Sequence, residues 1–409
     1  MRFRGLALGA LVGVGICMAD VAAAQTAMPA VAMGKRDLKI GIRAAGAYDS
    51  NVSRSSKTVA AIRGLQLSDY TFTPAASLSV LQPIGPETIY LNADAGYVFY
   101  KENTQLNSVR AAVNGGVLSR LGFCQHAFTA NYRASQNELQ NVDLGNVKNV
   151  QEATSVGTGL QCVTTTGLGG SIFVSRTDTT NQARVRRESD TTVETLATGI
   201  QYGRPSLGTF SLNFNFAGTQ FPNRITFGRP VGDGFFTQSY GIGYQRNFGT
   251  RLQVGAQAAT THVKREFAPP GVDTSFNTPT YSADVTYGFG PRITLQATAS
   301  RSVVPSQQLG KTLDKTTGYG LIGNYKAGPR LSFRGGLQRQ QVDSNVDTSI
   351  ALGPVVTSQR INSIYGSVTY SPGKLWSVSL DVRHDERKAN LPDFNYTSNR
   401  VGVTTQASF

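Results

Sequence analysis

Apolar side chains recur at every second position along most of this chain, and this period of two constrains the fold more than any other feature. Successive side chains of a β-strand point to opposite faces, so each such segment predicts a strand with one apolar and one polar face. No comparably long segment keeps a helical period. The clearest alternating sets are Ile89, Leu91, Ala93, Ala95, Tyr97, Phe99; Phe210, Leu212, Phe214, Phe216; Tyr240, Ile242, Tyr244; Tyr281, Ala283, Val285, Tyr287; and Trp376, Val378, Leu380, Val382.

The segments between these strands alternate in length. Short turns rich in glycine and proline, such as Gly85-Pro86 and Gly290-Pro291, alternate with longer polar stretches, such as residues 49–67 and 221–234. This alternation predicts a meander of hairpins with one short-turn end and one long-loop end. A weak repeat of about 40 residues, in which Tyr244, Tyr287, Tyr325 and Tyr370 each precede a short turn, fits two strands per unit and an aromatic girdle at the membrane interface.

Counting hairpins predicts 18 strands, with a range of 16 to 18. The expected strands start near residues 38, 68, 87, 107, 124, 148, 168, 188, 208, 234, 251, 276, 291, 314, 330, 357, 374 and 396. Only 16% of the residues are charged, below the usual quarter for a soluble protein, and Gly is frequent at 44 residues. We therefore predict an all-β, transmembrane, antiparallel up-and-down β-barrel with short periplasmic turns and long extracellular loops, because closure removes exposed strand edges.

The N-terminus predicts export. Arg2 and Arg4 precede an apolar segment from Leu6 to Ile16, and Ala22-Ala23-Ala24 offers a cleavage site before Gln25. We predict a signal peptide at residues 1–24, a short periplasmic tail at 25–37 and the barrel at 38–409. The predicted location is the outer membrane of a Gram-negative bacterium.

Two motifs carry a family resemblance. The last strand, Val401 to Phe409, ends on an aromatic residue and is similar to the closing strand of Gram-negative outer-membrane barrels, in which the barrel-assembly machinery reads that residue. The segment Tyr48-Asp49-Ser50-Asn51-Val52 resembles the opening of a β-barrel porin family whose members are often associated with exopolysaccharide export. The resemblance implies an assembly signal at Phe409, and a role with an anionic polysaccharide and periplasmic export components.

With the apolar phase toward lipid, several charged residues point into the lumen. Guanidinium groups that line a pore lower the barrier for anions and bind carboxylates or phosphates. The alternative is a network across the lumen in which these arginines pair with acids, and the sequence leaves both open. The predicted lumen-lining residues are Arg110, Arg133, Arg334, Arg383, Asp94, Asp284 and Asp381.

A second basic group is expected at the extracellular rim, on the long loops or their margins. It can attract an acidic polymer to the mouth, but binding of lipopolysaccharide phosphates is the reading we favour. No recognition fold or compact basic platform accompanies these residues, so nucleic acid is not an expected partner. The group consists of Arg184, Arg186, Arg187, Lys264, Arg265, Arg387 and Lys388.

Cys124 and Cys162 remain after removal of the signal peptide, and the predicted hairpin places them side by side. A disulfide is the expected state in an oxidising compartment, and two reduced cysteines that act as small apolar residues are the alternative. No catalytic triad, metal-binding spacing or phosphate-binding loop is evident, so we expect no enzyme activity, no metal and no cofactor.

The sequence thus predicts an outer-membrane channel, associated first with exopolysaccharide export or secretion. A general or anion-preferring diffusion porin is the first alternative. A barrel with an occluded lumen that binds polysaccharide is the second. Expected partners are outer-membrane lipid, lipopolysaccharide and the barrel-assembly machinery.

Overall fold

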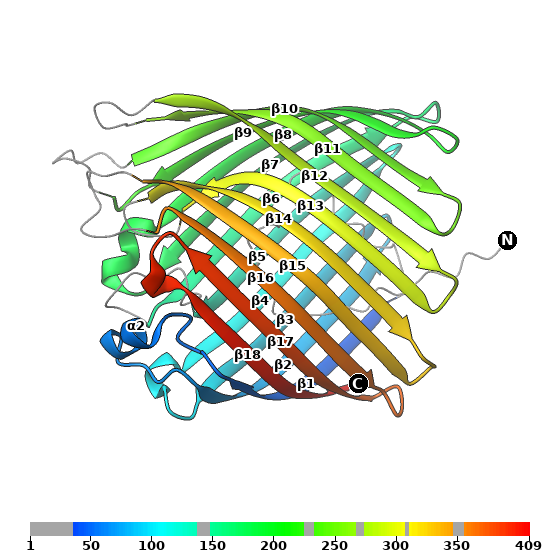
Figure 1. Cartoon of the computed structure of the whole chain (residues 1–409). Coiled ribbons are helices and arrows are strands. Elements are labelled where there is room, and N and C mark those ends of the chain that lie inside the picture. The colour runs from blue at the N-terminus through cyan, green and yellow to red at the C-terminus, as the bar shows by residue number, and fades with distance from the viewer. Residues whose placement is uncertain (1–35, 137–147, 225–232, 267–273, 307–310, 347–355) are drawn as a thin grey trace.

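The computed structural model describes residues 36–136, 148–224, 233–266, 274–306, 311–346 and 356–409. Its strands form one closed sheet of 18 antiparallel strands in which β1 pairs with both β2 and β18, so the predicted barrel is confirmed (Figure 1). The strands are β1 (Asp37–Asp49), β2 (Asp69–Ile84), β3 (Glu87–Tyr100), β4 (Ser108–Leu121), β5 (Cys124–Gln136), β6 (Val150–Val163), β7 (Leu168–Asn181), β8 (Thr191–Arg204), β9 (Gly208–Phe221), β10 (Asp233–Phe248), β11 (Leu252–Arg265), β12 (Ser275–Phe289), β13 (Ile293–Pro305), β14 (Lys311–Lys326), β15 (Leu331–Val346), β16 (Ser358–Tyr370), β17 (Trp376–Ala389) and β18 (Tyr396–Ser408).

Each strand begins within three residues of its expected start. Short and long connections alternate as predicted, and the C-terminus lies at the short-turn end (Figure 1). Glycines with positive φ, for example 58° at Gly85 and 65° at Gly290, open several of the short turns, where a side chain would be strained. Phe409 is joined to Ile40 of β1 by two backbone hydrogen bonds, so the last residue completes the closure of the barrel.

The apolar phase of the strands faces outward. Leu380 and Leu321, for example, each expose 48% of their surface, as expected for side chains that contact lipid rather than a protein core. Aromatic residues gather on this face next to the short turns, where Phe210 lies 4.8 Å from Tyr244 and Tyr287 lies 4.4 Å from Phe289 between ring centroids. This band is the predicted interfacial girdle.

In the described part of the chain, four short helical segments lie on the long-loop side. They are α2 (Lys57–Ile62) and the 3₁₀ turns η1 (Thr104–Leu106), η3 (Arg184–Ser189) and η4 (Pro392–Phe394). Among the described residues, no helix has the length and apolar character needed to span a bilayer. The expected signal peptide and all but the last two residues of the expected tail lie outside the described residues.

Candidate functional site

The lumen is the candidate site, because the polar phase of the strands faces it. Strand register places all seven predicted lumen-lining residues in this phase, opposite the exposed apolar side chains. On β3, for example, Asp94 lies on the face opposite Ile89 and Phe99, which expose 40% and 45% of their surface.

Asp94 binds two arginines. Nη2 of Arg43 lies 3.3 Å from its carboxylate, and Nη2 of Arg110 lies 3.4 Å from it. All three side chains are only partly exposed, at 17–25%. One carboxylate therefore serves two guanidinium groups and leaves this cluster with a net positive charge. Arg43 was not among the predicted residues, although the alternation of Leu38, Ile40 and Ile42 places it in the polar phase.

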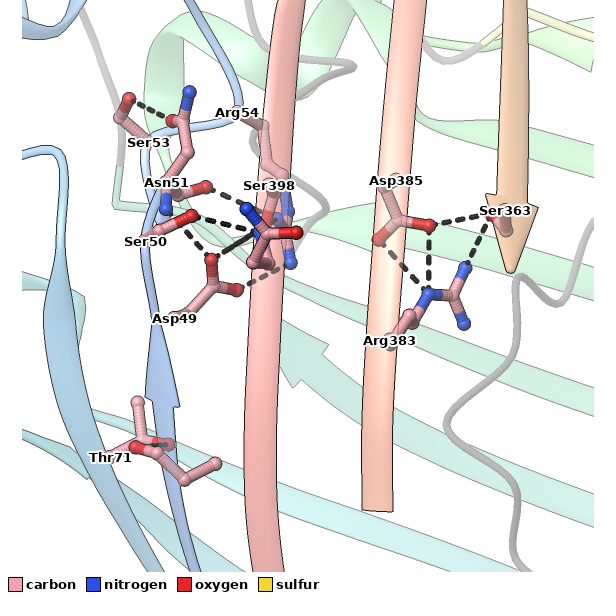
Figure 2. Close-up of polar contacts among 12 residues, drawn as sticks. Asp49, Ser50, Asn51, Ser53, Arg54, Thr71, Ser363, Arg383, Asp385 and Ser398 are labelled. Carbon is pink, nitrogen blue, oxygen red and sulfur yellow. Dashed lines mark hydrogen bonds and ion pairs between the residues drawn. The ribbon is translucent and has the colours of Figure 1, made fainter. Parts of the chain in front are cut away.

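Arg383 belongs to a second polar cluster, on β16 and β17. Its Nε donates to Asp385 at 2.8 Å, and its Nη2 donates to Ser363 at 3.1 Å (Figure 2). Ser363 in turn donates to Asp385 at 2.5 Å, so the three side chains form a closed ring of contacts. Asp385 and Ser363 were also missed by sequence reasoning, because only the pairing of β16 with β17 brings them together.

The remaining predicted lumen residues make no ion pairs among the described residues. Within the described part of the chain, no ion pair involves Arg133, Arg334, Asp284 or Asp381. Asp284 lies beside Gly255 and Asp381 beside Gly402, where a Cβ would come within 2.4 Å and 2.8 Å of the carboxylate oxygens. Both alternatives that the sequence left open therefore occur, at different residues. Some arginines line the lumen without an ion pair, and others are paired with acids.

The lumen has two unlike walls. Arg43, Arg110, Arg133, Arg383 and Arg400 line the wall on either side of the β1–β18 closure. In contrast, none of the lumen-facing positions of β6 to β9 carries an acidic or basic side chain. Serine, threonine, asparagine, glutamine and glycine predominate there.

A chain of hydroxyl groups extends from this wall onto β10 to β12, where Asp233, Arg265 and Asp284 are also lumen-facing. Ser239 lies 2.8 Å from Thr261, which lies 2.9 Å from Thr280 between hydroxyl oxygens. Thr261 is buried and links the other two, whereas the partly exposed Ser239 and Thr280 can donate to or accept from a passing polar solute. The lumen therefore places an arginine-bearing wall opposite a hydrogen-bonding wall.

The Tyr48–Val52 motif anchors the first long loop at the closure of the barrel. The Asp49 carboxylate accepts hydrogen bonds from Arg54 at 2.7 Å, from Ser398 at 2.6 Å and from the backbone N–H of Asn51 at 2.9 Å (Figure 2). Ser50 exchanges two further hydrogen bonds with the backbone of Asn399 on β18. We call these contacts the first-loop anchor.

Beyond the anchor, the first loop packs into the mouth. Leu65 and Leu106 are buried against Tyr100, whose position on β3 faces the lumen. Asp69 and Asn103 tie this loop to the β3–β4 loop, with 2.8 Å between the Asn103 amide nitrogen and the Asp69 carboxylate. The first loop is thus packed against a lumen-facing side chain of β3.

The expected basic rim is partly wrong. Arg186, Arg265 and Arg387 are buried, with 2%, 3% and 1% of their surface exposed, and so do not form an extracellular rim. The period of two explains the error for two of them, because Arg265 and Arg387 occupy lumen-facing positions whereas their neighbours Lys264 and Lys388 point outward. Lys388 pairs with Glu386 at 3.0 Å, and Arg184 and Arg187 lie exposed on η3.

Cys124 and Cys162 are directly opposed on β5 and β6 and are joined by a disulfide. They lie on the outward face at the short-turn end. The three histidines also face outward, and His262 and His384 bond to Asn277 and Asn399 at 2.9 Å and 2.7 Å. None of these histidine contacts joins a serine or an acid, and no group of three metal-ligating side chains occurs among the described residues.

Comparison with known proteins gives the fold. No family model and no curated protein matches the sequence. Similar solved structures include OccK9 (OpdG) of Pseudomonas aeruginosa, at 12% identity and a TM-score of 0.50, with 92% of this chain and 99% of that chain covered. A BenF-like porin from Pseudomonas fluorescens Pf-5 is 13% identical with a TM-score of 0.49, over 92% of this chain and 99% of that one. The chain thus has the fold of an outer-membrane porin.

Proposed function

We propose that this protein is a diffusion channel of the outer membrane that prefers anions. The observation that carries the proposal is the arginine-bearing wall, in which Arg43 and Arg110 share one carboxylate while Arg133 has no ion pair among the described residues. Fixed guanidinium groups replace part of the hydration of an anion and raise the barrier for cations.

The neutral wall supports a preference for anions that also carry hydroxyl groups. A solute in contact with both walls can place its negative group against arginine and its hydroxyls against Ser239 and Thr280. Transport in this mechanism is passive diffusion of the solute between two fixed walls.

The exopolysaccharide association finds no support in the comparisons or in the fold. That association depended on the Tyr48–Val52 motif, which forms the first-loop anchor. There the Asp49 carboxylate accepts hydrogen bonds from Arg54, Ser398 and Asn51. Holding the first loop at the closure of the barrel is enough to explain the motif, and no polysaccharide is needed to account for it. The diffusion channel is therefore the function that the lumen supports best.

The test is the conductance of the refolded protein in a planar bilayer, with the reversal potential measured in a KCl gradient. Wild type is expected to conduct with a preference for chloride, and Arg133→Glu is expected to shift the reversal potential toward cation selectivity. Arg133 is the appropriate position because it is exposed on the lumen face. The matched control is Arg204→Glu, which makes the same charge change on the outward face next to a short turn.

A negligible conductance in wild type, or equal reversal potentials in wild type and Arg133→Glu, would contradict the proposal. An anionic oligosaccharide added to one side distinguishes the export reading. Transport of the oligomer itself across the bilayer, with little permeation of small anions, would favour export over diffusion.

A further inference from the structure

Cationic side chains form a row on the outward face of β13 to β17. Register aligns Arg301 with Thr317, Thr317 with Gln341, Gln341 with Arg360, and Arg360 with Lys388. Arg339 lies on β15, two residues closer to the short-turn end than Gln341, and is aligned with Tyr319. We call Arg301, Arg339, Arg360 and Lys388 the outer cationic row. None of the first three was singled out in the sequence.

The row lies just beyond the apolar band. On the same face and the same strands, Leu337, Ile364 and Val382 are lipid-exposed at 52%, 56% and 48%, and they lie closer to the short turns. Short turns of such barrels are periplasmic, so the row lies at the level of the outer-leaflet headgroups. Tyr281 and Tyr319, whose hydroxyl oxygens are 3.3 Å apart, lie beside the row and are aligned with Arg301 and Arg339, respectively.

Neighbouring acids offset only part of the positive charge of the row. No ion pair of Arg301, Arg339 or Arg360 occurs within the described residues, and Nε of Arg301 and of Arg360 has no hydrogen-bond partner there. The acids on this wall are Glu386, which pairs with Lys388 at 3.0 Å, and Asp343, which accepts from Gln341 at 3.2 Å.

The outward face of β7 and β8, on the opposite wall, lacks this excess of positive charge. On β7 and β8, outward-facing Arg176 is held by Asp178 at 3.0 Å and by Glu194 at 3.3 Å. One arginine there has ion pairs with two acids, whereas no ion pair of Arg301, Arg339 or Arg360 occurs among the described residues. The excess of positive charge at headgroup level therefore distinguishes β13 to β17 from β7 and β8.

We propose that the outer cationic row binds the phosphate groups of an anionic glycolipid of the outer leaflet, of the lipid A type. Guanidinium groups bind phosphate oxygens in pairs, and the acyl chains of the same lipid would lie along Leu337, Ile364 and Val382. Arg301 and Arg360 are three strands apart, roughly 14 Å at the usual spacing, which suits a headgroup that carries two phosphates. This site is separate from the lumen and does not depend on the proposed channel function.

The experiment compares lipid binding by the refolded full-length protein in neutral detergent, with native mass spectrometry as the readout. The variant is Arg301→Gln with Arg339→Gln and Arg360→Gln. Its matched control is Arg292→Gln with Arg330→Gln and Lys374→Gln, which removes the same charge from exposed short-turn residues of the same wall. The probes are bisphosphorylated lipid A and a fully dephosphorylated lipid A with the same acyl chains.

Wild type and control are expected to bind the bisphosphorylated lipid equally, and the variant about tenfold or more weakly, since several charge-assisted hydrogen bonds are lost. The dephosphorylated lipid should bind all three proteins equally weakly. Equal affinity of wild type and variant for the bisphosphorylated lipid would overturn the proposal, as would equal affinity of wild type for the two lipids. If the triple variant fails to show the heat-modifiable migration of a folded barrel, Arg339→Gln alone is measured, because this exposed side chain has no ion pair to lose among the described residues.

Discussion

Asp94 sets the charge of the arginine-bearing wall, because its one carboxylate lies against both Arg43 and Arg110. We expect Asp94→Asn to raise the anion permeability and lower the cation permeability about two- to threefold each, so that their ratio rises about five- to eightfold. The loss of a unit charge about 7 Å from the passing ion, at a dielectric near that of water, changes the energy of an ion of either sign by about 0.6 kcal/mol. Reversal potentials in a KCl gradient measure this ratio.

Asp178→Asn is the matched control for that experiment, since Asp178 also binds an arginine but lies on the outward face. Its reversal potential should equal that of wild type. A shift of the same size in both variants would show that overall charge, rather than the lumen lining, determines selectivity.

At the scale of elements, the first-loop anchor holds β1, β18 and the loop at residues 50–68 together. Asp49→Ala removes a 6%-exposed carboxylate that accepts hydrogen bonds from both Arg54 and Ser398. We expect a loss of about 2–4 kcal/mol in the free energy of unfolding, in the range for breaking a largely buried charged pair. Urea unfolding in lipid vesicles gives this value, and limited proteolysis should reveal new cleavage in the first loop.

Asp393→Ala serves as the control for the anchor. Asp393 lies exposed on η4, and its backbone oxygen, rather than its side chain, accepts from the N–H of Ser56 in the first loop. The substitution should leave both stability and proteolysis unchanged. Equal loss in the two variants would assign the effect to the β17–β18 loop instead of the anchor.

The β5–β6 hairpin carries the disulfide between Cys124 and Cys162, which are 38 residues apart. Replacing both cysteines by alanine is expected to lower the free energy of unfolding by about 2–4 kcal/mol, because the unfolded chain gains freedom. Urea titrations with and without reductant measure the effect. Reductant should destabilise wild type and leave the double variant unchanged; identical midpoints for both proteins without reductant would contradict a stabilising disulfide.

For the whole molecule, the assignment of outward and lumen faces decides every functional statement. Leu380 lies in the middle of the apolar set of β17, so Leu380→Arg should cost about 2–4 kcal/mol or prevent assembly. Ser379→Arg, one residue away, faces the lumen and should assemble with normal stability. The two measurements are heat-modifiable migration and urea unfolding in vesicles, and the reverse order of stability would invert the assignment of faces.

Much of this architecture could be predicted from the sequence, since a period of two fixes which side chains share a face. The alternation around Asp94 and Arg383 was enough to place both in the lumen phase. Partners could not be predicted, because they depend on register between strands. Asp94 meets Arg43 across β2, and Asp49 meets Ser398 across the closure. Arg387 was placed on a loop because the length of β17 was underestimated at its extracellular end.

The first-loop anchor joins residues that are far apart in the chain, with 349 positions between Asp49 and Ser398. Contacts of such large sequence separation form late, since every intervening hairpin has to be in place first. The first-loop anchor therefore cannot be complete before the final strand has arrived. Until then β1 keeps one open edge and Asp49 lacks Ser398, so a complete anchor reports that the barrel is closed.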